Sequence, residues 1–164
     1  MTDEDRVGDV AAAQERGGAL EPSETVLLLG RAKAADVAQR LSRTEPDFDG
    51  VVIGGDSMFA IDGEVHGKPH TPEEATRRWL RMRGRTGVLH SGHSVFRLEP
   101  GREPREAFAA ARASVTFADD VSDEEIAEYV ASGEPLHVAG AFTVDSLGGA
   151  FITRVEGDPS TVVG

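Results

Sequence analysis

The sequence predicts a single α/β domain, and three observations support that fold class. Residues 51–53 are three adjacent β-branched residues, typical of a strand that is buried on both faces. Two stretches join a capping signal to an apolar stripe at helical spacing, which predicts helices after Thr71 and Ser122. Alternating apolar residues within 86–118 predict two further strands.

Composition and charge restrict the class of protein. The chain has 164 residues, 39% hydrophobic and 28% charged, as expected for one soluble globular domain with a real core. No apolar run could span a bilayer and the acidic start is no signal peptide, so a cytoplasmic location without membrane contact is expected. The absence of cysteine excludes disulfides, thiolate catalysis and Cys-ligated zinc. A net charge of −12 argues against nucleic acid as a partner, but it allows an anionic small molecule bound through local cations and a divalent metal.

The elements are expected in a definite order along the chain. Helices are expected over residues 3–16, 21–42, 71–83 and 122–132. Strands are expected over residues 51–56, 58–61, 65–66, 86–98, 107–118, 139–145 and 151–155. Thr2 and Ser23 are the expected caps of the first two helices, and Asp62-Gly63 predicts a tight hairpin turn. The buried stripe of the second helix is expected to contain Leu27, Ala34, Val37, Ala38 and Leu41.

The candidate functional stretch is Gly54-Gly55-Asp56-Ser57, followed by Gly67-Lys68-Pro69. An aspartate at the C-terminal end of a buried strand lies where α/β sheets bind ligands. Lys68 follows in a loop from which its ammonium could meet the ligand of that carboxylate. Acid, loop and lysine together predict a site for a metal and a phosphate chain. The alternative is a plain chain reversal, because all of these residue types favour turns.

Basic residues are almost all arginine: of the 17, only Lys33 and Lys68 are lysine. A lysine offers a compact charge that the planar fork of arginine cannot copy, so both are candidate site residues. Lys33 falls at the margin of a helical stripe, where its head could reach a cleft or could simply extend into solvent. The arginines of residues 77–85 predict a solvated face or a dimer contact. His66 and His70 flank Lys68 and could bind a metal, although no third ligand is near in sequence.

These segments together resemble the Maf family, the septum-formation-inhibitor-like nucleoside triphosphate pyrophosphatases. They occur in family order over nearly the whole chain, and Asp-Ser-Met at the central acid resembles the actinobacterial branch. The carrying segments are Ala32-Lys33-Ala34, Gly55-Asp56-Ser57, Gly67-Lys68-Pro69, residues 122–135, Ala139-Gly140-Ala141-Phe142 and residues 157–164.

The resemblance implies a fold and an activity. The fold is a mixed twisted sheet flanked by helices, usually in a homodimer. The activity is hydrolysis of a nucleoside triphosphate to a monophosphate and pyrophosphate with Mg²⁺ or Mn²⁺. The implied role is housekeeping of nucleotide pools, with a historical link to septum formation.

The resemblance also assigns roles by position. Asp56 matches the catalytic acid that binds the metal and activates water, and Lys33 and Lys68 match phosphate-binding lysines. Three further residues match positions in or near the substrate cleft. They are Ser57, Glu134 and Asp145, the last standing where the family has a base-contacting glutamine.

Some family features are absent. The first strand, its Ser-x-x-Arg-Arg phosphate loop and the helix after the final Val-Val-Gly are not found, and a family lysine is Val138. The chain therefore resembles a Maf protein truncated at both ends, and we expect it to be a weak or inactive enzyme. The alternative is a non-catalytic nucleotide-binding or septum-regulating relative. A third possibility, a phosphomonoesterase, lacks a recognisable nucleophile motif.

Overall fold

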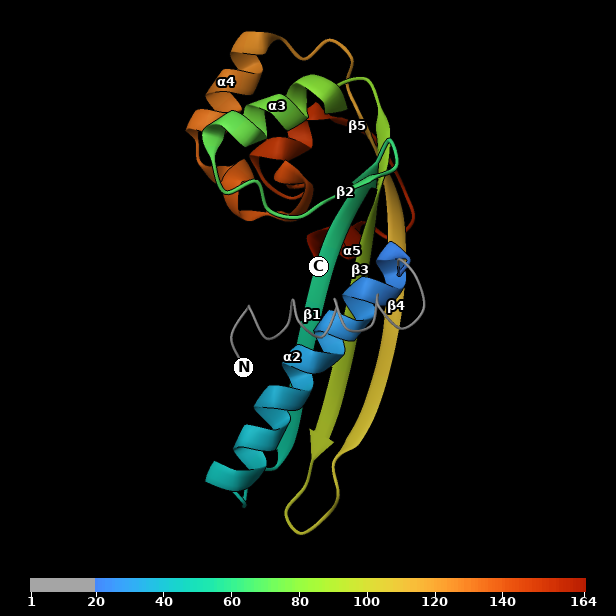
Figure 1. The fold of residues 1–164 in the computed structure, drawn as a ribbon, viewed down its shortest axis with the longest axis vertical. Helices are drawn as coiled ribbons and strands as arrows, with labels where there is room; N and C mark the ends of the chain where they lie inside the picture. The colour runs from blue at the N-terminus through green and yellow to red at the C-terminus, as the bar shows by residue number, and fades with distance from the viewer. Residues whose placement is uncertain (1–19) are drawn as a thin grey trace. The chain divides into compact units, whose positions relative to one another are not determined.

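The computed structural model describes residues 20–164, so the helix expected over residues 3–16 and its Thr2 cap lie outside the described part. A five-stranded sheet has the order β2-β1-β3-β4-β5, and helices flank it (Figure 1). The predicted α/β class is confirmed. The chain divides into two compact units, which we describe separately. The first ends at Asp56 and includes Ser91–Ala111, and the second contains Ser57–His90 and Arg112–Gly164.

The elements alternate along the described part of the chain. Its helices are α2 (Pro22–Thr44), α3 (Pro72–Met82), α4 (Asp123–Ala131) and α5 (Pro159–Val163). Its strands are β1 (Gly50–Ile61), β2 (Glu64–His66), β3 (Thr86–Leu98), β4 (Arg105–Phe117) and β5 (Ile152–Glu156). Three short 3-10 helices are η1 (Glu134–His137), η2 (Ala139–Ala141) and η3 (Leu147–Phe151).

Helix α2 of the first unit begins one residue after Glu21. The Glu21 side chain caps the third helical residue, Glu24, whose own side chain accepts a hydrogen bond from the Glu21 N–H at 3.1 Å. The predicted cap at Ser23 is wrong because Pro22 occupies the first helical position and moves the start forward. Val37 is 38% exposed, so its predicted place in the buried stripe is also wrong.

Helix α2 packs closely on β1 and β3 through glycines. A Cβ at Gly54 would lie 2.6 Å from both the Gly30 carbonyl oxygen and the Ala34 nitrogen. A Cβ at Gly92 would lie 2.5 Å from the Leu27 nitrogen, so only glycine fits at these two strand positions. Figure 1 shows α2 lying along this part of β1. This short separation determines which α2 side chains reach the strand.

Strand β1 differs from its prediction in length and burial. It joins the two strands expected over 51–56 and 58–61, so Asp56 lies inside a strand and not at its C-terminal end. Val51 is 56% exposed and Ile53 is 68% exposed, so burial on both faces is wrong. Successive side chains of a strand point to opposite faces. Val52 accordingly packs in a small core with Ala34 and Ala38 of α2, while its two neighbours point away.

The local signals of the second unit are confirmed. Asp62 and Gly63 have φ values of 53° and 76°, as a two-residue hairpin turn requires, and β2 pairs antiparallel with β1. The Thr71 hydroxyl accepts from the Glu74 N–H at 3.3 Å at the start of α3. The Ser122 hydroxyl accepts from the Glu125 N–H at 3.1 Å at the start of α4. The two helices contact one another and cover an aromatic core.

The strand expected over residues 139–145 is wrong. The chain forms 3-10 turns there, and Gly140 and Ala141 have φ values of 74° and 63°. A Cβ at Gly140 would lie 2.7 Å from the Phe59 side chain, so the residue must be glycine for space as well as conformation. The Ala141 carbonyl accepts a hydrogen bond of 2.7 Å from the indole N–H of Trp79, which lies in the aromatic core. Packing against the aromatic core thus determines the backbone conformation of this segment.

Candidate functional site

Lys33 and Asp56 lie together in the first unit, although they come from α2 and β1. The Lys33 ammonium donates to the Asp56 carboxylate and, at 3.3 Å, to the Gly55 carbonyl oxygen. Both side chains are partly exposed, so the ion pair is open to a ligand from solvent. The close helix–strand contact at Gly54 brings this turn of α2 over the strand. A lysine has three N–H donors, so its head can also donate to a phosphate oxygen.

Lys68 lies in the second unit, exposed in the loop between β2 and α3. The loop is held on both sides of the lysine. The Gly67 carbonyl accepts from the Gly140 N–H at 3.3 Å, and the His70 N–H donates to the Leu136 carbonyl at 3.0 Å. Tertiary structure therefore brings the Lys68 loop beside η1 and η2, which lie far from it in sequence.

Glu134, the first residue of η1, accepts hydrogen bonds from a set of surrounding donors. Three of the donors are side chains: the Tyr129 hydroxyl, at 2.8 Å, the Thr143 hydroxyl and the Ser146 side chain. The other two are backbone N–H groups, of Leu147 at 3.2 Å and of Gly148 at 3.0 Å. Burial alone would raise the pKa of Glu134, but these hydrogen bonds outweigh it and hold the pKa at about 2. The carboxylate is thus ionised and well satisfied by the protein itself.

The remaining two predicted site residues also belong to the second unit. Asp145 is exposed on the turn that the Glu134 carboxylate organises. Ser57 follows Asp56 directly in β1, and a Cβ at Gly164 would lie 3.5 Å from its hydroxyl. The structure therefore joins Lys33 to Asp56 in one unit, and the Lys68 loop to the Glu134 segment in the other.

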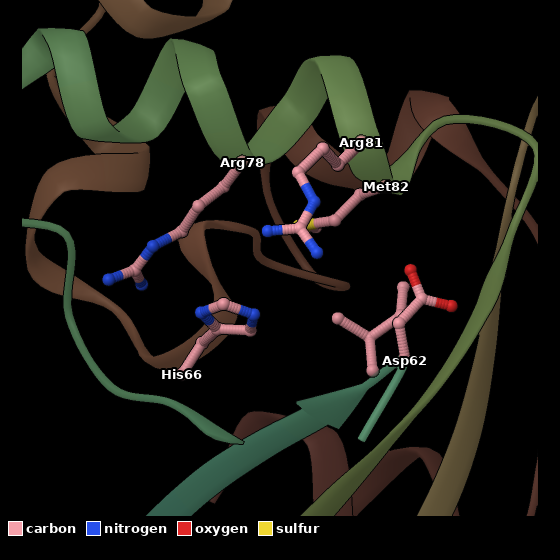
Figure 2. A pocket seen from close by; sticks show the side chains of 6 residues that line it. Asp62, His66, Arg78, Arg81 and Met82 are labelled. Carbon is pink, nitrogen blue, oxygen red and sulfur yellow. The ribbon is translucent and has the colours of Figure 1, made fainter. Parts of the chain in front are cut away.

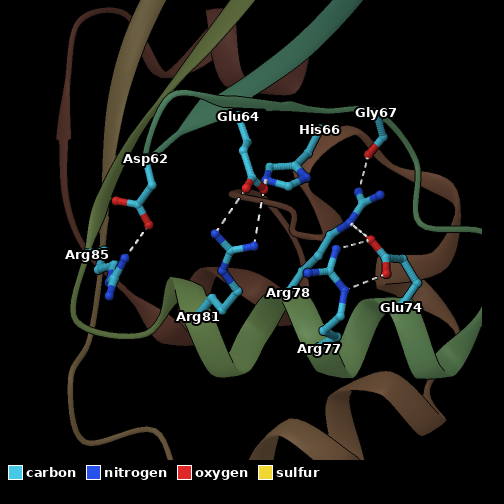
Figure 3. Close-up of polar contacts among 9 residues, drawn as sticks. All are labelled: Asp62, Glu64, His66, Gly67, Glu74, Arg77, Arg78, Arg81 and Arg85. Atoms are coloured by element: carbon cyan, nitrogen blue, oxygen red, sulfur yellow. Dashed lines mark hydrogen bonds and ion pairs between the residues drawn. The ribbon is translucent and has the colours of Figure 1, made fainter.

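The arginines at one end of the second unit pair with acids, as Figure 3 shows. Arg85 pairs with Asp62, and Arg81 pairs with Glu64 at 3.1 Å. Arg77 and Arg78 both donate to Glu74 at 2.7 Å. Glu74 was not predicted from the sequence as a partner of these arginines. Its spacing of three and four residues before the two arginines is the signal that could have found these pairs.

A small pocket lies beside these arginines (Figure 2). Its volume is about 10 Å³, which is room for about one water molecule and not for a nucleotide. Figure 2 shows the His66 ring below the guanidinium ends of Arg78 and Arg81. Burial lowers the pKa of His66, and the charge of Arg78 lowers it further. His66 is therefore neutral at pH 7.

The described residues can supply part of a metal site, with the remaining ligands coming from the phosphates of a bound substrate. Within residues 20–164, no three His, Asp or Glu side chains gather closely enough to hold a metal ion by themselves. Mg²⁺, however, is commonly bound by one or two carboxylates together with substrate phosphate oxygens. The partly exposed carboxylate of Asp56 meets that requirement. In the same part of the chain, no helix is both long and apolar enough to cross a membrane.

The Lys33–Asp56 pair offers N–H donors of the kind that bind phosphate oxygens and a carboxylate of the kind that binds Mg²⁺. The model of the family described as "Maf-like protein" matches residues 5–164. The chain belongs to this family.

Three of its relatives, among others, are named "Nucleoside triphosphate pyrophosphatase". The chain is 59% identical over 160 residues to that of Leifsonia xyli subsp. xyli, covering 98% of this chain and 73% of the relative. It is 51% identical over 143 residues to the relative from Nocardia farcinica, which is 87% of this chain and 66% of that relative. It is 55% identical over 141 residues to the relative from Salinispora tropica, which is 86% of this chain and 60% of that relative. The chain thus spans part of the length of each relative.

Proposed function

We propose that this chain hydrolyses nucleoside triphosphates to nucleoside monophosphates and pyrophosphate with Mg²⁺ or Mn²⁺. The observation that carries the proposal is the contact between Lys33 and Asp56. It joins the lysine and the carboxylate that a metal-bound triphosphate needs, from elements far apart in sequence. The shared name of the relatives supports the same reaction.

In the proposed reaction, water adds across the anhydride between the α- and β-phosphates. Asp56 holds the metal and orients the water, and Lys33 and Lys68 bind phosphate oxygens whose negative charge increases as pyrophosphate departs. The metal, when bound, offsets phosphate charge and lowers the pKa of a coordinated water. We further propose a cytoplasmic protein, active as a homodimer, that acts in nucleotide-pool housekeeping with a link to septum formation.

Product analysis tests this function. The purified chain is incubated with a panel of ribo- and deoxyribonucleoside triphosphates, with Mg²⁺, with Mn²⁺ or with a chelator. We expect monophosphate and pyrophosphate in equal amounts, formed only with metal. Binding without turnover would instead identify a non-catalytic nucleotide-binding relative, and inorganic phosphate as the first product would identify a phosphomonoesterase.

A further inference from the structure

The peptide bond that leads into Lys68 is held by a side chain that the proposed reaction has not used. The Gly67 carbonyl accepts a hydrogen bond of 2.7 Å from the Arg78 guanidinium (Figure 3). It also accepts the bond from the Gly140 N–H. Because a peptide unit is planar, the direction of the Gly67 carbonyl also sets the direction of the Lys68 N–Cα bond. Arg78 therefore controls where the Lys68 side chain begins.

The loop needs such a restraint. Apart from its two chain neighbours, no heavy atom of residues 20–164 lies within 4 Å of a Cβ built at Gly67, so packing there does not restrict the backbone. Glycine also has the widest conformational freedom of all residues. Without the two hydrogen bonds to its carbonyl, Gly67 would let the Lys68 ammonium sample many positions.

Arg78 is itself held in place for this contact. Its side chain is only 11% exposed, and its Nε donates to Glu74 at 2.7 Å. Hydrogen bonds from Arg77 and Arg78 lower the pKa of Glu74 to about 2, so this carboxylate is charged throughout the neutral range. The Nε–H of the Arg78 guanidinium thus donates to the charged Glu74 carboxylate, while another of its N–H groups donates to the Gly67 carbonyl of the loop.

Arg77 provides a natural comparison on the same helix. It donates to the same Glu74 carboxylate through two bonds of 2.7 and 2.8 Å. Its side chain is 52% exposed, and within residues 20–164 its hydrogen bonds go only to Glu74. The two arginines have the same charge and the same carboxylate partner, but of the two only Arg78 also donates to the Gly67 carbonyl.

We propose that Arg78 is a positioning residue for Lys68, aligning its ammonium for the phosphate chain of the substrate. This inference rests on the proposed function, in which Lys68 binds phosphate. Arg78 does not bind phosphate itself, because its guanidinium is largely buried and engaged by Glu74 and Gly67.

A double-mutant cycle tests the inference. The four proteins are wild type, Arg78→Met, Lys68→Ala and the double variant, with Arg77→Met as the matched control. We measure kcat/KM with the nucleotide that wild type hydrolyses fastest, and affinity for inorganic triphosphate with Mg²⁺ by calorimetry. We expect Arg78→Met to lower kcat/KM about 10–100-fold, as expected for a misaligned reacting group. The same change in the Lys68→Ala background, and Arg77→Met alone, should each cost less than about twofold.

Each possible result decides a separate question. Equal losses from Arg78→Met with and without Lys68 would show independent effects and overturn the positioning role. An equal loss in Arg77→Met would assign the effect to the Glu74 pair. Arg78→Lys, which keeps the charge and N–H donors but not the planar fork, should recover part of the activity. Urea unfolding identifies any variant that fails to fold. If wild type neither hydrolyses nucleotides nor binds triphosphate, the proposed function itself fails.

Discussion

At the scale of single residues, the arginines near α3 and the two lysines differ in their surroundings. The arginines near α3 pair with Asp62, Glu64 and Glu74 inside their own unit. Lys33 instead meets Asp56 at a partly exposed point of β1, and Lys68 is exposed at a loop. Lysine suits these places because a compact ammonium can exchange one anionic partner for another.

Asp56→Asn should lower nucleotide turnover by about 10²–10⁴-fold, the usual contribution of a side chain that activates the attacking water. The amide can still accept a hydrogen bond from Lys33, so the fold should be kept, but it has no charge with which to hold a metal. The measurement is kcat with Mg²⁺ alongside urea unfolding. Asp36→Asn is the control, because Asp36 pairs with Arg40 at 3.0 Å on α2. Wild-type turnover in Asp56→Asn would remove Asp56 from the mechanism.

Lys68→Ala should weaken triphosphate binding more than Lys68→Arg, and both should bind less tightly than wild type. The planar fork of arginine keeps the charge but places its donors differently from an ammonium. Calorimetry with Mg²⁺ and inorganic triphosphate measures the three affinities. Because Lys68 is exposed, neither change should alter the free energy of unfolding by more than about 0.5 kcal/mol. Equal affinity in all three proteins would contradict a phosphate contact.

At the scale of elements, short segments between helices depend on single polar side chains. The turn over residues 143–148 is not part of a strand, and the Glu134 carboxylate accepts hydrogen bonds from its N–H and hydroxyl groups. The Lys68 loop depends in the same way on Arg78. In both cases a charged group from an ordered element fixes a loop that lacks regular hydrogen bonds of its own.

Glu134→Gln should destabilise the fold by about 2–3 kcal/mol, because hydrogen bonds to a charged acceptor are lost and an amide N–H₂ faces other donors. Urea unfolding at pH 7 measures the change. Asp145→Asn on the same turn is the control, since Asp145 is exposed and should be neutral within about 0.5 kcal/mol. A stable Glu134→Gln protein that has lost triphosphate affinity would instead indicate a direct substrate contact.

At the scale of the whole molecule, acid sensitivity should come from carboxylates that the fold keeps charged. Glu74 and Glu134 have pKa values of about 2 against an ordinary value of 4.5. The unfolded chain therefore binds protons more readily than the folded chain across this interval. Their stabilising contribution is complete above about pH 4.5, and it is lost as the pH falls towards 2.

Urea unfolding measured at a series of pH values tests whether stability is lost as the pH falls. The free energy of unfolding should fall between about pH 4.5 and pH 2, and the slope should be smaller in Glu134→Gln, which lacks one of the two groups. Glu73→Gln is the control, because Glu73 is an exposed acid at the start of α3. An unchanged slope in Glu134→Gln would mean that this carboxylate is not held charged by the fold.

The sequence by itself determined the features that short-range chemistry controls. The caps at Thr71 and Ser122, the Asp62-Gly63 turn and the bounds of β3 were predictable because each depends on a few adjacent residues. The family and its candidate site residues were also recognisable, because short motifs keep their order along the chain. The α/β class followed from the same local patterns.

Only the tertiary structure decided what depends on long-range packing. Val51 and Ile53 look buried in sequence, yet they point away from α2 because the glycine contacts bring that helix to the opposite face of β1. Residues 139–145 were expected to form a strand, yet the aromatic core requires a left-handed Gly140 there. The contact between Lys33 and Asp56 and the restraint of the Lys68 loop by Arg78 likewise join elements whose separation no local pattern encodes.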